Sequence, residues 1–237
     1  PALWDMLNRG DSPFVASRHN RLAALRLREG TGHWLIGGAP DVQSDEFSGL
    51  FFLGAPLAHE QRLYTLVEDR GQVRLLAIDP APAEQPVLLW SQPILNVPPL
   101  LSISQNELRR TSALTPAADG SVVVCPTGAG TVVAFDIDQQ RLLWSRQYRS
   151  AEQERPMEVV LRNQLRARSQ GDFDAQQRQA LDRLLDEPRW RTPSRPIIHR
   201  GLVLLPTPED HGLVCLELLT GETRWQRKVD SALYVAA

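Results

Sequence analysis

The chain has 237 residues, of which 42% are hydrophobic, so it is long enough to bury the core of one large domain or two small ones. Its formal net charge of −2 gives no attraction for a polyanion, and we therefore expect no nucleic-acid partner. No apolar run is long enough to span a bilayer, so we expect no transmembrane segment in this stretch. Because the chain begins at Pro1 rather than at a methionine, we also expect it to be part of a longer protein.

The N-terminal part reads as a short helix followed by half of a repeated unit. Apolar side chains at helical spacing predict one short helix in residues 1–18. Residues 21–27 and 33–36 have the composition of two short strands, and the glycines between them are typical of a turn. We interpret residues 19–37 as the last half of a unit whose first half is missing or degenerate.

Three full units follow at residues 48–92, 111–148 and 194–229, and each repeats the same three landmarks. A proline opens each unit, a glycine lies in its central hairpin, and a tryptophan closes it. The prolines are Pro56, Pro116 and Pro196, the glycines are Gly71, Gly130 and Gly212, and the tryptophans are Trp90, Trp144 and Trp225, with Trp34 closing the half unit. Proline suits a strand at a sheet edge and glycine suits a tight hairpin, so the pattern predicts repeated antiparallel sheets.

Residues 151–190 differ in character from the repeated units. Two apolar stripes at helical spacing, separated by Gly171, predict a helical hairpin inserted between two sheets. An insertion on a repeat scaffold is a common place for function, so this hairpin is our first candidate for a protein contact. Trp190 lies outside the repeat pattern, and we expect it to be the tryptophan nearest to a surface site.

The closing half of each unit carries a family resemblance. Residues 214–225 read Val-Cys-Leu-Glu-Leu-Leu-Thr-Gly-Glu-Thr-Arg-Trp, and less regular versions occur at 133–144 and 76–90. They resemble the repeat of the PQQ-like quinoprotein β-propellers, which has an alanine, a hydrophobic residue, an aspartate, a Thr-Gly turn and then a tryptophan. The sequence departs from that pattern at Arg26 and Glu217, which replace the aspartate, and the Thr-Gly turn is lost from the second and third units.

The resemblance implies a mainly β fold, namely a partial β-propeller of about three to four four-stranded antiparallel blades in one incomplete domain over residues 1–237. In that family the tryptophans dock each blade on the next, and we expect the four closing tryptophans to do so here. Since three and a half blades do not close a ring, we expect open edges at both ends and the start of another blade at residues 231–235. The resemblance also implies a periplasmic or cell-envelope location.

Enzymes of this family use bound pyrroloquinoline quinone, a calcium ion, a catalytic aspartate and, in several, a disulfide between adjacent cysteines. Here no two cysteines are adjacent, and no acidic loop with calcium-ligand spacing appears. We therefore predict no catalytic residue, no metal ligand and no cofactor, and we assign no cofactor-binding residue.

The acidic pairs and the glycine-rich loop have structural explanations. We interpret Asp45-Glu46 as loop carboxylates and Glu68-Asp69 as part of a hairpin turn that ends at Gly71. The sequence at 128–130 is interpreted as a hairpin turn rather than a phosphate loop, because no helix follows it.

The histidines and cysteines are explained in the same way. His59 and His199 hold the same place in their units, so repetition accounts for them better than shared catalysis. Cys125 and Cys215 lie in apolar runs and are expected to be buried free thiols, which leaves the redox compartment undecided.

Our leading hypothesis from the sequence is a non-catalytic binding or scaffolding module, whose partner is another protein or the remaining blades of a longer chain. One alternative is a fragment of a pyrroloquinoline quinone-dependent dehydrogenase whose catalytic residues, quinone and calcium lie outside this segment. Another is a segment that resembles the propeller lipoprotein of outer-membrane assembly machinery, which holds its client by strand addition.

Overall fold

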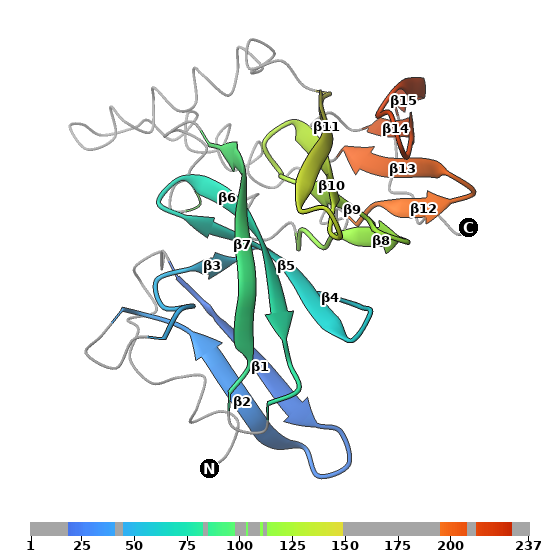
Figure 1. Ribbon diagram of the computed structural model, residues 1–237. Helices are drawn as coiled ribbons and strands as arrows, with labels where there is room; N and C mark the ends of the chain where they lie inside the picture. The colour runs from blue at the N-terminus through green and yellow to red at the C-terminus, as the bar shows by residue number, and fades with distance from the viewer. Residues whose placement is uncertain are drawn as a thin grey trace, which may run out of the picture.

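The computed structural model describes residues 19–40, 45–82, 85–97, 103, 110, 113–148, 195–207 and 212–228. Within these residues the elements are β-strands, and they form four antiparallel sheets that follow one another along the chain (Figure 1). The mainly β fold expected from the sequence is therefore confirmed. Several predictions lie outside the described residues. They are the short helix in residues 1–18, the helical hairpin in residues 151–190, the surface position of Trp190, and the start of another blade at residues 231–235.

The last two sheets show the repeated unit in its simplest form. Sheet 3 has the order β8 (Ala117–Asp119), β9 (Val122–Pro126), β10 (Thr131–Asp136) and β11 (Arg141–Gln147). Sheet 4 has the order β12 (Ile197–His199), β13 (Leu202–Thr207), β14 (Gly212–Glu217) and β15 (Thr223–Lys228). Each strand pairs with the next one in the chain, so every unit is an antiparallel meander of four strands.

Sheet 2 is a five-stranded variant of the same meander. It contains β3 (Phe51–Phe52), β4 (Leu57–His59), β5 (Arg62–Asp69), β6 (Gln72–Asp79) and β7 (Val87–Asn96). β3 and β4 both pair with β5, with Phe52 opposite Val67 and Leu57 opposite Tyr64. Two short strands thus share the place that β8 occupies alone in sheet 3.

Sheet 1 contains only β1 (Arg21–Arg26) and β2 (Thr31–Gly37). Their register matches the third and fourth strands of the other sheets. The closing tryptophan lies opposite a small residue in every sheet, and the register shifts immediately after that residue. The four pairs are Ala24–Trp34, Ala77–Trp90, Ala134–Trp144 and Cys215–Trp225. Sheet 1 therefore corresponds to the second half of a unit.

The repeated landmarks lie where the chain needs them. Pro56, Pro116 and Pro196 each come directly before a short strand that pairs on one side only, β4, β8 or β12, where a missing backbone N–H costs no ladder bond. The turn after the third strand needs a residue with positive φ, which is Gly30 (64°), Gln140 (50°) and Gly221 (69°) in sheets 1, 3 and 4. Gln140 shows that the left-handed position persists where the glycine of the family pattern is lost.

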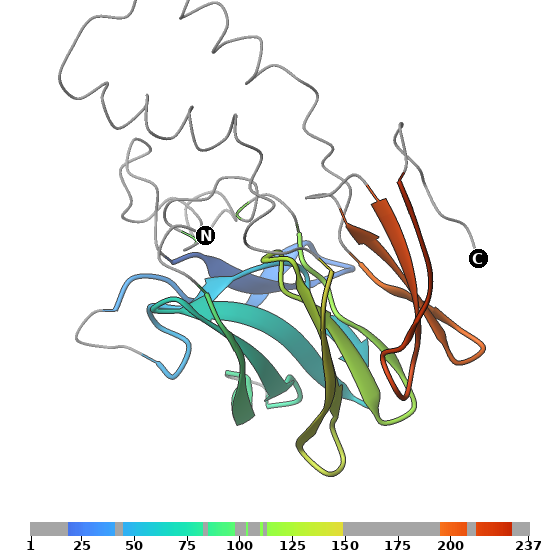
Figure 2. The same cartoon turned by 90° about the horizontal axis from the view of Figure 1, so that it is seen from above.

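The sheets pack face to face, and seen from above they follow one another in an arc from sheet 1 to sheet 4 (Figure 2). β8 contacts both β4 and β12, so the first strands gather on one side of the arc. One apolar cluster fills each space between neighbouring sheets. The core thus consists of three separate layers of side chains, each shared by two sheets.

One turn assignment from the sequence is wrong. Glu68 was predicted to lie in a hairpin turn, but it is inside β5, and only 3% of it is exposed. The turn is formed by Arg70 and Gly71, both with positive φ. Glu68 tolerates burial because its Oε1 accepts the backbone N–H of Ile103 at 2.7 Å, a contact with a segment far along the chain.

Candidate functional site

The contact between sheets 3 and 4 is built around Trp144. Its indole Nε1 donates a hydrogen bond to the carbonyl oxygen of Leu218 at 2.8 Å, and only 8% of the residue is exposed. A Cβ on Gly221 would lie 2.5 Å from Trp144 Cδ2, so the ring fits only against a glycine. The Thr-Gly turn of the fourth unit therefore has a packing function as well as a conformational one.

Trp90 occupies the corresponding place between sheets 2 and 3 but is held differently. Its ring centroid lies 6.0 Å from that of Tyr64 and 5.7 Å from that of Phe135, both in tilted arrangements. Its indole nitrogen is buried and has no hydrogen-bond partner within the part of the chain that the structure describes. An aromatic cluster thus replaces the hydrogen bond made by Trp144.

Trp34 and Trp225 are the outer members of the series. Trp34 is buried in the cluster between sheets 1 and 2. Trp225 lies in β15, all six residues of which are exposed, and 41% of the tryptophan itself is exposed. Within the described residues, no sheet beyond β15 covers this indole. The repeat pattern alone gave no signal of this difference.

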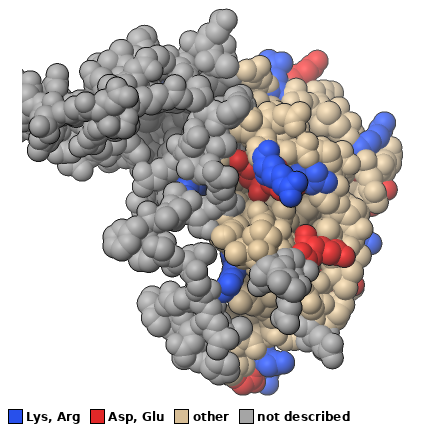
Figure 3. Space-filling model, turned by 90° about the vertical axis from the view of Figure 1, so that its left-hand side faces the viewer, with Lys and Arg blue, Asp and Glu red and all other residues tan. Residues whose placement is uncertain are grey.

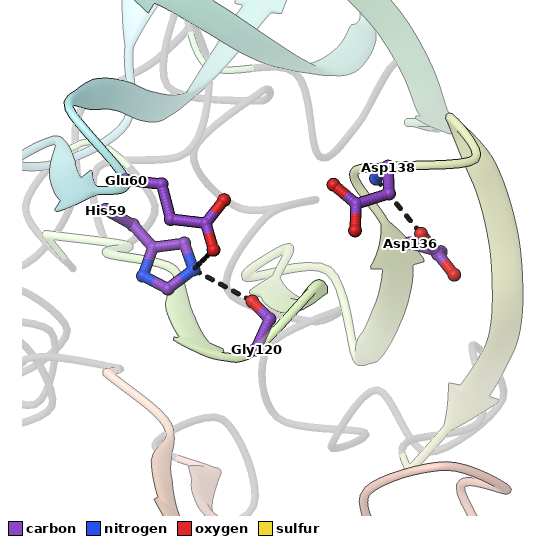
Figure 4. A network of polar contacts seen from close by, with 5 residues as sticks. All are labelled: His59, Glu60, Gly120, Asp136 and Asp138. Carbon is purple, nitrogen blue, oxygen red and sulfur yellow. Dashed lines mark hydrogen bonds and ion pairs between the residues drawn. The ribbon is translucent and has the colours of Figure 1, made fainter.

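The two histidines that share a place in the repeat do not share surroundings. His59 Nε2 lies 2.8 Å from the carbonyl oxygen of Gly120 in the next sheet and 3.9 Å from Glu60 Oε1 (Figure 4). His199 ends β12 at the equivalent position and is exposed. The His59 contact links the first turns of sheets 2 and 3, which is a structural role.

Asp45 and Asp136 stabilise turns. Asp45 Oδ1 accepts the backbone N–H of Phe47 and the hydroxyl of Ser48, both at 2.9 Å. Asp136 Oδ1 accepts the backbone N–H of Asp138 at 3.0 Å (Figure 4) and that of Gln139 at 2.9 Å. The family aspartate in sheet 3 is thus a cap for the turn that carries Gln140.

Both cysteines are free and buried, as predicted. Burial raises the pKa of the Cys125 thiol far above its usual range. Burial also raises the pKa of Cys215, with Glu217 adding to that effect and the Arg224 guanidinium opposing it. Neither thiol is activated as a nucleophile, because the reactive form is the thiolate.

Glu217 takes the place of the family aspartate in sheet 4 and makes a cross-strand ion pair. Its Oε2 accepts hydrogen bonds from Arg224 Nη2 at 2.6 Å and Nε at 2.8 Å. The hydrogen bond to Glu217 raises the pKa of Arg224. In sheet 1 the equivalent positions hold Arg26 and His33, whose Nη2 and Nδ1 atoms are 3.5 Å apart. Both departures from the family pattern thus retain a polar pair across the last two strands.

The charged surface is mixed rather than concentrated. On the face shown in Figure 3, basic and acidic side chains are scattered over a mostly uncharged surface. Nowhere in the described ranges do three or more His, Cys, Asp or Glu side chains come close enough to share a metal ion. In the same part of the chain, no helix has the length and apolarity needed to cross a membrane.

Comparison with solved structures places this fold among known proteins. BamB from Moraxella catarrhalis is 14% identical, with a TM-score of 0.50 over 87% of this chain and 46% of that chain. A europium-containing methanol dehydrogenase is 12% identical (TM-score 0.40, 75% of this chain and 26% of that one). A quinohemoprotein alcohol dehydrogenase from Pseudomonas putida HK5 is 13% identical (TM-score 0.38, 75% and 21%). The present chain thus spans less than half the length of these proteins.

No curated protein matches the sequence. A family model does match, over residues 6–227, and it is described as outer membrane protein assembly factor BamB. This match covers nearly the whole chain and confirms the resemblance to PQQ-like repeats. The chain therefore belongs to the family of the outer membrane protein assembly factor BamB.

Proposed function

We propose that this chain is a non-catalytic part of a β-propeller, and that it acts as a protein-binding scaffold in an assembly complex of the outer membrane. The family to which the chain belongs supports the assembly role and a location in the cell envelope. Within a larger ring, residues 19–37, 48–92, 111–148 and 194–229 would be successive blades of one domain, with another blade beginning at residues 231–235.

The observation that carries the proposal is that the chemically capable side chains are used for packing and turns. Asp136 caps a turn, His59 links two sheets, and Cys125 is buried in an apolar cluster. The closing tryptophans serve as docking residues for the next sheet, as the Trp144–Leu218 hydrogen bond illustrates. A scaffold needs this kind of rigid repeated surface and no reactive group.

Purification of the tagged protein from its native envelope tests the proposal. We expect it to fractionate with the envelope and to co-purify with proteins that assemble outer-membrane proteins, as identified by mass spectrometry. Fractionation with the cytoplasm would contradict the proposal. So would stoichiometric pyrroloquinoline quinone and calcium in the purified protein together with dye-linked alcohol oxidation, because these would indicate a dehydrogenase.

A further inference from the structure

The contact between sheets 2 and 3 departs from the regular unit at one position of β5. Tyr64 in this strand lies opposite Ala77, which in turn lies opposite Trp90. The residues equivalent to Tyr64 are Val124 in sheet 3 and Leu204 in sheet 4. Of the three sheets with four or more strands, only sheet 2 therefore has a hydroxyl group in the row of side chains that ends in the closing tryptophan.

The same contact also departs from the regular unit at the turn that receives the tryptophan. Gln140 follows β10 at the position that Gly221 holds after β14. A Cβ on Gly221 would lie 2.5 Å from Trp144 Cδ2, so an indole lies this close to the turn only beside a glycine. Because Gln140 has a Cβ, Trp90 does not lie against its turn as Trp144 does. This displacement explains why the Trp90 N–H lacks, within the described residues, a carbonyl partner like that of Trp144.

The two departures leave two buried polar atoms in one aromatic pair. Tyr64 is 0% exposed, and within the described residues neither its Oη nor Trp90 Nε1 has a hydrogen-bond partner. The ring centroids lie 6.0 Å apart, which is the separation of two rings in contact. An unpaired buried hydroxyl or N–H costs free energy, and a buried water molecule needs at least two polar partners. The indole offers a donor, and the hydroxyl offers both a donor and acceptor lone pairs.

We propose that one ordered water molecule is bound between Tyr64 and Trp90, and that Gln140 creates this site by keeping the indole away from its turn. The water accepts the indole N–H and shares a second hydrogen bond with the Tyr64 hydroxyl, so both buried groups are satisfied. Apolar side chains of the cluster between sheets 2 and 3 surround the pair, and the bound water therefore exchanges slowly with solvent. The inference concerns this internal contact and does not depend on the protein partner proposed above.

Nuclear magnetic resonance of the purified protein detects such a water. We expect a cross-peak between the Trp90 indole proton and a long-lived water molecule, assigned by its loss in Trp90→Phe. Gln140→Gly should also remove it, because a glycine lets the indole N–H reach the Ile137 carbonyl, the equivalent of the bond that Trp144 makes. A wild-type Trp90 indole signal without a water cross-peak would overturn the proposal. A cross-peak that persists in Gln140→Gly would overturn the role of Gln140.

Urea unfolding of Tyr64→Phe distinguishes a water-bound hydroxyl from an unpaired one by the sign of the effect. Loss of a water-bound hydroxyl should lower the equilibrium constant for folding roughly 2- to 10-fold, whereas loss of an unpaired one should leave it unchanged or raise it. Thr65→Val is the matched control, because Thr65 is equally buried in β5 but faces sheet 1, and its single unpaired hydroxyl offers too few partners to hold a water. This control should not lose stability. A Tyr64→Phe variant as stable as the wild type, or an equal loss in Thr65→Val, would overturn the proposal.

Discussion

The contacts between sheets 2 and 3 and between sheets 3 and 4 hold the closing tryptophan of the repeat in different ways. Trp144 donates its indole N–H to the Leu218 carbonyl, and its ring lies against a glycine that leaves no room for a Cβ. Within the described residues Trp90 has no partner for its buried N–H, and it packs instead in a tilted cluster with Tyr64 and Phe135. The repeat position therefore determines which residue docks, whereas the local turn determines whether docking is polar or aromatic.

Removal of either ring should cause the largest loss of stability. Truncation of a buried tryptophan to alanine typically costs about 3–5 kcal/mol. We expect a loss in this range for Trp144→Ala and a loss near its lower end for Trp90→Ala, because Trp90 is only partly buried, both measured by urea unfolding with circular dichroism. Trp225→Ala is the matched control, because 41% of this tryptophan is exposed, and it should cost much less. Equal losses at all three positions would contradict the partial exposure of Trp225.

Alanine substitutions at Gly221 and Gly201 should separate the cost of overpacking against Trp144 from the cost of backbone strain. Gly221→Ala brings a Cβ into the Trp144 ring and should cost roughly 1–3 kcal/mol from overpacking, in addition to the strain of a positive φ. Gly201→Ala has a similar φ (75°) but no heavy atom within 4 Å of the new Cβ, so it reports the strain alone. A difference near zero between the two variants in urea unfolding would show that Trp144 moves away without cost.

Tryptophan-to-phenylalanine substitutions should separate the two kinds of docking. Trp144→Phe leaves the buried Leu218 carbonyl without its donor, which typically costs about 1–3 kcal/mol beyond the change in ring size. Trp90→Phe removes a buried N–H that has no partner within the described residues, so its loss should be smaller. Thermal unfolding of the two variants side by side checks the order, and a larger loss for Trp90→Phe would reverse our interpretation.

Substitution of Cys125 should have the smallest effect on the free energy of unfolding, and that effect should depend on pH. It lies in the cluster between sheets 2 and 3, and burial raises its thiol pKa, so the folded chain keeps the thiol neutral. Its contribution to stability is complete below the usual cysteine pKa of about 8.5, and it falls as pH rises above that value, by at most about 1.4 kcal/mol per pH unit. We expect Cys125→Ala to flatten the alkaline decline in unfolding free energy. Val123→Ala removes apolar bulk from the same cluster and should leave the slope unchanged.

The sequence predicted the repeat well because its landmarks follow from backbone needs. Pro116, Gly130 and Trp144 each meet a local requirement of a strand edge, a hairpin or a sheet contact, and such requirements are legible in a single chain. Glu68 was misplaced because an acidic pair before Arg-Gly is typical of a turn, and its burial depends on the distant Ile103 N–H. The exposure of Trp225 depends on what lies beyond its own unit. The surroundings of residues that depend on distant segments therefore could not be predicted from the sequence.

The separation of the core into three layers has a consequence for how the chain unfolds. Within the described residues each apolar cluster is shared by two neighbouring sheets, so stability is approximately a sum of terms for single sheets and for adjacent pairs, as in a one-dimensional Ising chain. Sheet 3 has a neighbour on both sides, whereas sheet 4 has one described neighbour and ends in the wholly exposed β15. The chain should accordingly unfold first at its exposed β15, with amide protons of β15 exchanging before those of β9 and β10.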